Sequence, residues 1–188
     1  YRAYFSLPLL DPNYKLKNLK ETFEILNKNN FQIGLHPGIL SSYFSRSLRS
    51  EIKKINSFLE VNILSVRNHW LSFFHKRTWK IQKINGIKQD FTVGFNNIPG
   101  FRNFCTLKYY PYKNLETIPT IIMDGHFFNY GYKRGQEVKD IIKPYIDELK
   151  NIGGIVSIDF HQRFFHEYYG YKIVYKQMLE YLKEEGLL

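Results

Sequence analysis

The sequence predicts an α/β protein, an incomplete (β/α) barrel of about six to seven parallel strands with helices outside and the first strand missing. Two observations indicate this fold class. Short apolar runs alternate with amphipathic helical segments along all 188 residues, and such alternation implies parallel strands joined by crossover helices. The apolar runs are continuous and do not alternate with polar residues, which is typical of strands covered on both faces.

The expected strands are short and are separated by turn residues. They cover the ranges Ala3–Leu9, Phe31–Leu35, Asn62–Val66, Ile87–Val93, Ile118–Met123 and Ile155–Phe160. No Gly-rich loop follows any of them, so a dinucleotide-binding or P-loop fold has little support. The stretch Gly94–Pro111 contains the breakers Pro99, Gly100 and Pro111, and it is expected to be a long loop.

The expected helices carry apolar residues at spacings of three and four. In the first helix Leu16, Leu19, Phe23 and Leu26 recur in this way, which indicates one buried face. The helices cover Asn13–Asn29, Ser47–Leu59, Lys76–Ile84, Glu137–Leu149 and Tyr171–Lys183. The pair Gly153-Gly154 is expected to turn the chain into the last strand.

Residues 1–188 are expected to form one domain, because the length suits one domain and no linker divides the chain. The chain begins at Tyr1 with a strand-like segment, so we expect that an N-terminal unit of the fold is missing from it. No apolar run approaches the roughly 18 residues of a membrane span, and no signal-peptide pattern is present, so the expected compartment is the cytoplasm. The single cysteine, Cys105, excludes an intrachain disulfide and a multi-cysteine zinc site.

The chain is basic, with 27 Lys and Arg against 17 Asp and Glu and a formal charge of +10. Such a surplus is compatible with a nucleic-acid or acidic-polymer binder. The basic residues are spread along the whole chain, however, and no RNA-recognition, zinc-finger or helix-turn-helix signature is present. We therefore interpret the charge as a solvated surface and expect no specific nucleic-acid partner. The oligomeric state is left open.

Titratable side chains follow four of the expected strands: His36, Arg67 with His69, Asp124 with His126, and His161. In parallel α/β folds the strand ends point to one rim, where active sites are built. Each of these residues alone has an ordinary structural role open to it, such as capping a turn or packing at the rim. Together they indicate a site, and we expect His36, Arg67, Asp124 and His161 to converge on one rim.

Several strings resemble a known family. Gln32-Ile33-Gly34-Leu35-His36-Pro37 resembles the Glu-Ile-Gly-X-His block of the polysaccharide deacetylases, carbohydrate esterases with an incomplete (β/α) barrel. Further strings are similar, in order, to a divergent bacterial branch of that superfamily: Val66–Phe73, Thr78-Trp79, Asp90–Phe95, Gly100-Phe101-Arg102, Ile118–Asp124 and Asp159-Phe160-His161. Each string is short, but the ordered set covers nearly the whole chain.

The resemblance implies a metal-dependent carbohydrate deacetylase that removes acetyl groups from a polysaccharide or another acetylated sugar. It implies a divalent metal, with zinc as the candidate, and His36 stands where a metal-binding histidine of the family belongs. Arg67 resembles the arginine that orients the catalytic aspartate, and His161 resembles the histidine that serves as general acid. We also assign five residues to substrate binding: His69, Trp70, Arg102, Asp124 and His126.

The sequence departs from the family pattern at two places. The family's Asp-Asp pair, which provides the catalytic base and a metal ligand on the first strand, has no counterpart here. Leu40 stands where the second metal histidine would fall, and Ser41, Ser42 or His69 are the possible substitutes. We therefore expect this chain to bind a divalent metal weakly or not at all, with the carboxylates lying upstream. The alternative is a catalytically degenerate barrel that acts as a glycan-binding module.

Overall fold

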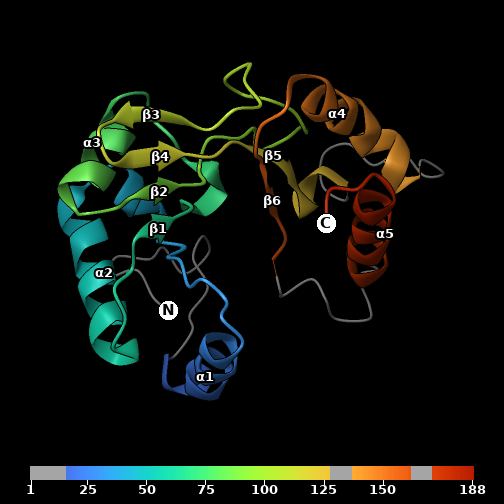
Figure 1. Cartoon of the computed structure of the whole chain (residues 1–188). Coiled ribbons are helices and arrows are strands. Elements are labelled where there is room, and N and C mark those ends of the chain that lie inside the picture. Colours follow the sequence, from blue (N-terminus) through green and yellow to red (C-terminus); the bar gives the residue numbers. More distant parts are fainter. Residues whose placement is uncertain (1–15, 128–136, 162–170) are drawn as a thin grey trace. The chain divides into compact units, whose positions relative to one another are not determined.

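A computed structural model describes residues 16–127, 137–161 and 171–188 (Figure 1). The chain divides into two compact units. The first contains Tyr1–Val93 and Tyr109–Ile118, and the second contains Gly94–Lys108 and Pro119–Leu188. Each unit is described by itself, so the expectation of one domain stays a prediction. The expected strand Ala3–Leu9 lies outside the described residues.

The first unit contains a four-stranded sheet in the order β1-β2-β4-β3. Its strands are β1 (Ser65–Val66), β2 (Gln89–Asp90), β3 (Tyr109–Tyr112) and β4 (Leu115–Thr117). β2 pairs in parallel with both β1 and β4. The expected strand that ends at Leu35 is reduced to one parallel bridge between Leu35 and Val66. The predicted parallel pairing of the segments around Leu35, β1 and β2 is therefore confirmed, although each strand is shorter than expected.

The β3–β4 hairpin corrects the sequence prediction in two respects. β3 lies partly inside the stretch Gly94–Pro111, which was expected to be loop, and it pairs with β4 in antiparallel fashion. Pro111 was interpreted as a breaker, but β3 is the edge strand of the sheet, where a missing N–H costs no ladder hydrogen bond. Asn114 takes a positive φ of 64° in the turn, as a tight hairpin requires. The described strands are thus not all parallel, and they do not establish a closed or nearly closed barrel.

Helices of the first unit are η1 (Leu16–Leu19), α1 (Lys20–Lys28), η2 (Ile39–Ser42), α2 (Ser45–Leu59), η3 (His69–Leu71) and α3 (Arg77–Ile84). The predicted helices α2 and α3 are confirmed to within two residues at each end. Leu48 and Ile55 of α2 are buried because they lie on one face of the helix. They pack in one core with residues from strands, from α3 and from connecting segments, which include Leu35, Ile63, Val66, Ile81, Ile87 and Leu115.

The second unit is built on two parallel strands, β5 (Thr120–Met123) and β6 (Ser157–Asp159). All four residues of β5 are buried, which explains its continuous apolar sequence. The helices α4 (Val138–Ile152) and α5 (Tyr171–Glu184) pack against each other. They enclose a second core formed by Ile121, Ile122, Phe127, Val138, Ile142, Ile146, Val174, Met178 and Leu182.

The predicted turn at Gly153-Gly154 is confirmed and has a steric cause. Both glycines have positive φ, 79° at Gly153 and 125° at Gly154. A Cβ atom on Gly154 would stand 2.4 Å from the carbonyl oxygen of Thr106. Only glycine therefore allows the chain to pass so close to the loop before β3. None of the helices in the described part of the chain is long and apolar enough to cross a membrane.

Candidate functional site

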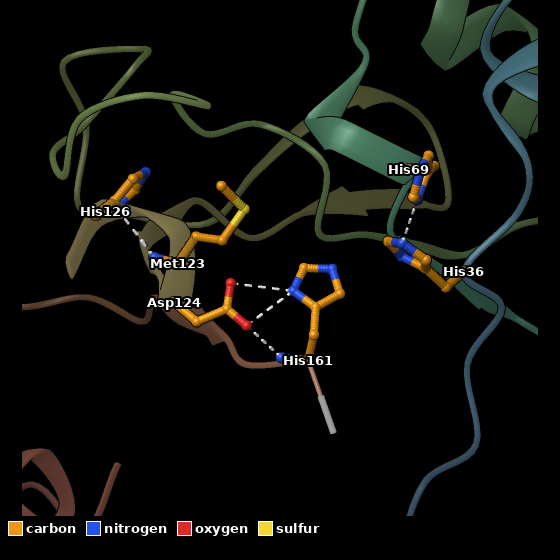
Figure 2. Close-up of polar contacts among 6 residues, drawn as sticks. All are labelled: His36, His69, Met123, Asp124, His126 and His161. Atoms are coloured by element: carbon orange, nitrogen blue, oxygen red, sulfur yellow. Dashed lines mark hydrogen bonds and ion pairs between the residues drawn. The ribbon is translucent and has the colours of Figure 1, made fainter. Parts of the chain in front are cut away.

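Two histidines meet at the ends of paired backbone segments in the first unit. His36 follows Leu35, and His69 lies three residues after Val66, the partner of Leu35. Nε2 of His36 and Nδ1 of His69 are 3.1 Å apart (Figure 2), and the two rings are nearly perpendicular at 77°. His69 is 4% exposed, and its backbone N–H donates to the carbonyl oxygen of Pro37.

Close backbone packing brings these two histidines together. Leu35 donates its N–H to the oxygen of Ser65, and Arg67 donates its N–H to the oxygen of Leu35. A Cβ atom on Gly34 would stand 2.7 Å from Oγ of Ser65. The glycine in the Gly34-Leu35-His36 string thus lets this segment pair with β1 without displacing the Ser65 hydroxyl, and the pairing places His36 opposite His69.

The spacing of the two ring nitrogens suits a shared metal ion. Two imidazole nitrogens that each lie about 2.0–2.1 Å from one tetrahedral zinc are about 3.3 Å from each other. The 3.1 Å between His36 and His69 is close to that value. Within residues 16–127, 137–161 and 171–188, no group of three or more His, Cys, Asp and Glu side chains is arranged to hold a metal. In this structure the two nitrogens share a hydrogen bond, so a role of the pair in binding a metal stays a prediction.

A buried carboxylate holds the chain segment that follows His36. Glu51 of α2 is 3% exposed and accepts hydrogen bonds from the N–H of Gly38 at 3.2 Å and from Oγ of Ser41 at 2.5 Å. These bonds fix the short helix η2, which directly follows His36-Pro37. Glu51 thus anchors the segment that carries His36.

Next to His69, Trp70 is presented outward on a strained turn. Trp70 and Leu71 both have left-handed φ, 57° and 49°, which is unusual for residues other than glycine. Asn68 clamps the turn, since its Nδ2 donates to the oxygen of Ser72 and its N–H donates to Oγ1 of Thr92. Trp70 stays 47% exposed and stacks on the His69 ring at an interplanar angle of 20°. Strain of this kind is often held at functional sites.

Arg67 also lies in the first unit, immediately after β1. Its Nε donates to the carbonyl oxygen of Phe91 at 3.3 Å, and its guanidinium lies 5.8 Å from the centre of the Phe91 ring. These contacts hold the arginine against the segment that follows β2. Its predicted role in orienting a catalytic aspartate stays a prediction.

In the second unit Asp124 and His161 form a close pair (Figure 2). They follow β5 and β6, whose parallel register pairs Met123 with Asp159. Asp124 is 1% exposed, and its carboxylate accepts hydrogen bonds from the backbone N–H of His161 at 2.7 Å and from Nδ1 at 3.0 and 3.1 Å. The contact fixes the proton on Nδ1, so Nε2 is the ring nitrogen suited to proton exchange with a substrate.

His126 and Arg102 contact backbone in the second unit. His126 is 2% exposed; its Nδ1 accepts from the N–H of Met123 and its Nε2 donates to the oxygen of Phe95, both at 3.1 Å. Burial lowers the pKa of His126. Nη1 of Arg102 donates to the oxygen of Gly94 at 3.2 Å. The geometry of His126 favours a structural role, and the predicted substrate-binding role of both residues stays a prediction.

Sequence reasoning did not single out Asp90, a buried acid in the first unit. Its carboxylate accepts hydrogen bonds from Nε1 of Trp79 at 3.1 Å, Nε2 of Gln82 at 2.8 Å and the N–H of Thr92 at 3.0 Å. Burial raises the pKa of Asp90, and these hydrogen bonds partly offset the rise. The available signal was a carboxylate inside the expected strand Ile87–Val93, since an acid that is buried there is costly unless it has buried partners.

The predicted residues thus fall into two local groups. His36, Arg67, His69 and Trp70 belong to the first unit, whereas Arg102, Asp124, His126 and His161 belong to the second. Within the units the structure brings His36 to His69 and Asp124 to His161. The convergence of His36, Arg67, Asp124 and His161 on one rim stays a prediction.

Comparison with known proteins supports the fold. No family model matches the chain, and no curated protein matches it. Among solved structures the chain is similar to the crystal structure of a "putative polysaccharide deacetylase from Mycobacterium smegmatis", with a TM-score of 0.55 and 15% sequence identity. The match covers 79% of this chain and 56% of that one. The chain therefore has a distant polysaccharide deacetylase-like fold, and it spans little more than half the length of that protein.

Proposed function

We propose that this chain is a deacetylase-like domain of a metal-dependent enzyme that hydrolyses acetyl groups from a polysaccharide or glycan precursor. The observation that carries the proposal is the 3.1 Å approach of two ring nitrogens, from His36 and His69, within a polysaccharide deacetylase-like fold. Two histidines whose ring nitrogens lie this close could both bind one metal ion after their shared proton is lost, and histidine nitrogens are common zinc ligands in hydrolases. The sequence strings that resemble the family include both histidines.

His36 and His69 would hold the divalent metal, with zinc as the candidate. When bound, such a metal polarises an acetyl carbonyl and lowers the pKa of a water molecule. Tetrahedral zinc sites in enzymes use three protein ligands, so a carboxylate must join the two histidines. We assign that ligand to the family's Asp-Asp pair, which residues 1–188 do not contain.

The pair of Asp124 and His161 would supply the general acid. The carboxylate of Asp124 keeps the proton on Nδ1 of His161 and stabilises the ring when it becomes charged. His161 would then hand a proton from Nε2 to the leaving amine or alcohol of the sugar. Trp70, held outward beside His69, offers an aromatic face to the apolar side of a pyranose ring.

A glycan-binding module is the second candidate function. One observation favours it: Trp70 is exposed on a strained turn that hydrogen bonds of Asn68 hold in place. A catalytically degenerate barrel would still bind the sugar but would no longer hydrolyse it.

Acetate release tests the enzyme directly. Because the proposed carboxylates are not among residues 1–188, the protein extended to include any residues that precede Tyr1 is loaded with zinc and incubated with an N-acetylated chitooligosaccharide and with an O-acetylated xylan, and free acetate is measured over time. Release that His36→Gln and His69→Gln each abolish supports the enzyme and identifies the linkage. Saturable glycan binding without acetate release from either substrate favours the binding module, and absence of both binding and release contradicts both functions.

A further inference from the structure

His126 closes the short turn that carries Asp124. The turn starts where β5 ends at Met123, and a helical turn begins at Asp124. Nδ1 of His126 accepts the N–H of Met123 at 3.1 Å (Figure 2). Asp124 lies between the two bonded residues, so the hydrogen bond sets the path of the backbone on which its carboxylate is mounted.

The same ring ties this turn to a distant segment. Nε2 of His126 donates to the oxygen of Phe95, 31 residues earlier in the chain, at 3.1 Å. The N–H of Gly100 donates to Ile121 of β5, which gives the 95–100 segment a second attachment to the strand. With one nitrogen accepting and the other donating, the ring must be the neutral tautomer that carries its proton on Nε2. The lowered pKa of His126, caused mainly by burial, agrees with a neutral ring.

The pairing of Asp124 with His161 has little tolerance for movement of this turn. Its hydrogen bonds span 2.7 to 3.1 Å, and a displacement of about 1 Å would lengthen them beyond useful range. Asp124 is almost fully buried, so water does not readily replace the lost contacts. The direction of the His161 ring therefore depends on the turn that His126 closes.

Packing alone does not require a histidine at this position. The neighbouring Phe127 is fully buried in the core of the second unit and already anchors the segment. A buried imidazole costs free energy unless both nitrogens find partners, and here both partners are backbone groups that flank the Asp124 turn. We infer that His126 is a positioning residue that fixes the Asp124 turn and thereby holds His161 in one tautomer and orientation. Its consequence for catalysis depends on the proposed deacetylase function.

The tautomer of His161 tests the inference without requiring enzyme activity. Nitrogen-15 NMR of the imidazole distinguishes a proton on Nδ1 from one on Nε2, and it is applied to the wild-type chain and to three variants. His126→Asn keeps an acceptor near the position of Nδ1, whereas His126→Gln keeps only a donor near Nε2, and His126→Leu keeps neither. Asp124→Ala provides the reference in which the carboxylate is lost. Near-ultraviolet circular dichroism verifies that each variant is folded.

We expect the wild type and His126→Asn to hold the His161 proton on Nδ1. His126→Gln and His126→Leu should lose this preference and approach the Asp124→Ala spectrum. If His126→Leu fails to fold, the comparison of His126→Asn with His126→Gln still tests the inference. An unchanged His161 tautomer in folded His126→Gln overturns the inference, and so does its loss in His126→Asn, because that variant retains the bond to Met123.

An activity measurement adds a separate result. If acetate release is established, His126→Gln should lower kcat about tenfold with little change in KM, while His126→Asn stays near the wild type. If neither the wild type nor any variant releases acetate in the protein extended to include any residues that precede Tyr1, the proposed function fails, but the NMR comparison still decides whether His126 positions His161.

Discussion

The carboxylate of Asp124 receives both the backbone N–H and Nδ1 of His161, at 2.7 Å and 3.0 Å, from a residue 37 positions later in the chain. The parallel register of β5 and β6 brings the two residues together, because it pairs Met123 with Asp159. A charged acceptor of this kind makes a stronger hydrogen bond than a neutral one. The pair is the best-defined catalytic candidate in the second unit.

Replacing Asp124 by asparagine should lower acetate release strongly. Asparagine is nearly isosteric but removes the charge that stabilises a protonated His161, so we expect kcat to fall roughly tenfold to a hundredfold with KM little changed. Steady-state kinetics on an acetylated oligosaccharide measures the effect, with Asp140→Asn on the exposed face of α4 as a matched control. Equal kcat values for Asp124→Asn and the wild type would exclude a catalytic role for the pair.

Zinc binding by the 188-residue chain should be weak. In the proposed site two histidine nitrogens would provide only part of a tetrahedral ligand set, and each missing ligand lowers affinity. Calorimetric titration with zinc should therefore give binding weaker than micromolar, which His36→Ala or His69→Ala removes, while His75→Ala leaves it unchanged. Micromolar affinity together with deacetylation by this chain alone would show that its essential carboxylates do not lie upstream of Tyr1.

Trp70 should contribute to glycan binding in either proposed function. Its ring is exposed beside the histidine pair and is held by a clamped backbone, so little ordering is required when a sugar stacks on it. Trp70→Ala should weaken glycan affinity about threefold to tenfold, and Trp70→Phe should retain most of it. Calorimetry with an acetylated oligosaccharide gives the affinities. The comparison is Phe44→Ala, another exposed aromatic of the first unit; an equal effect of both alanine variants would argue against a specific role.

Asp90 should make folding stability depend on pH. Burial raises its pKa in the folded state above the ordinary value of 3.8, so the folded state prefers the protonated acid. Its contribution to stability is fully present below pH 3.8 and is lost as the pH rises through the folded pKa. Urea unfolding across this range should show the wild type losing free energy of unfolding relative to Asp90→Asn as the pH rises. The opposite slope would mean that Asp90 is ionised in the folded state and is stabilised by Trp79, Gln82 and Thr92.

The sequence alone was sufficient for much of the local structure. Apolar spacing predicted α2 and α3, and continuous apolar runs predicted the buried strand β5. Such patterns are local, because a helix or a strand buries one recurring set of side chains wherever it packs. The placement of His36 after Leu35 and of His161 after β6 could also be predicted, since both need only the end of a strand. The strings that resemble the polysaccharide deacetylases predicted the fold of that family. The similarity to a solved structure supports this prediction for the fold alone.

Long-range packing decided the rest. The hydrogen bonds from His161 to Asp124 depend on the register of two strands more than 30 residues apart, and the facing nitrogens of His36 and His69 depend on the close approach at Gly34. The sequence does not reveal such distances, because many registers bury the same apolar residues. In the same way the antiparallel pairing of β3 and the burial of Asp90 follow from their tertiary neighbours. The chain itself determined which residues can serve as ligands or acids, and the tertiary structure determined which of them meet, because hydrogen bonds form only within a few ångströms.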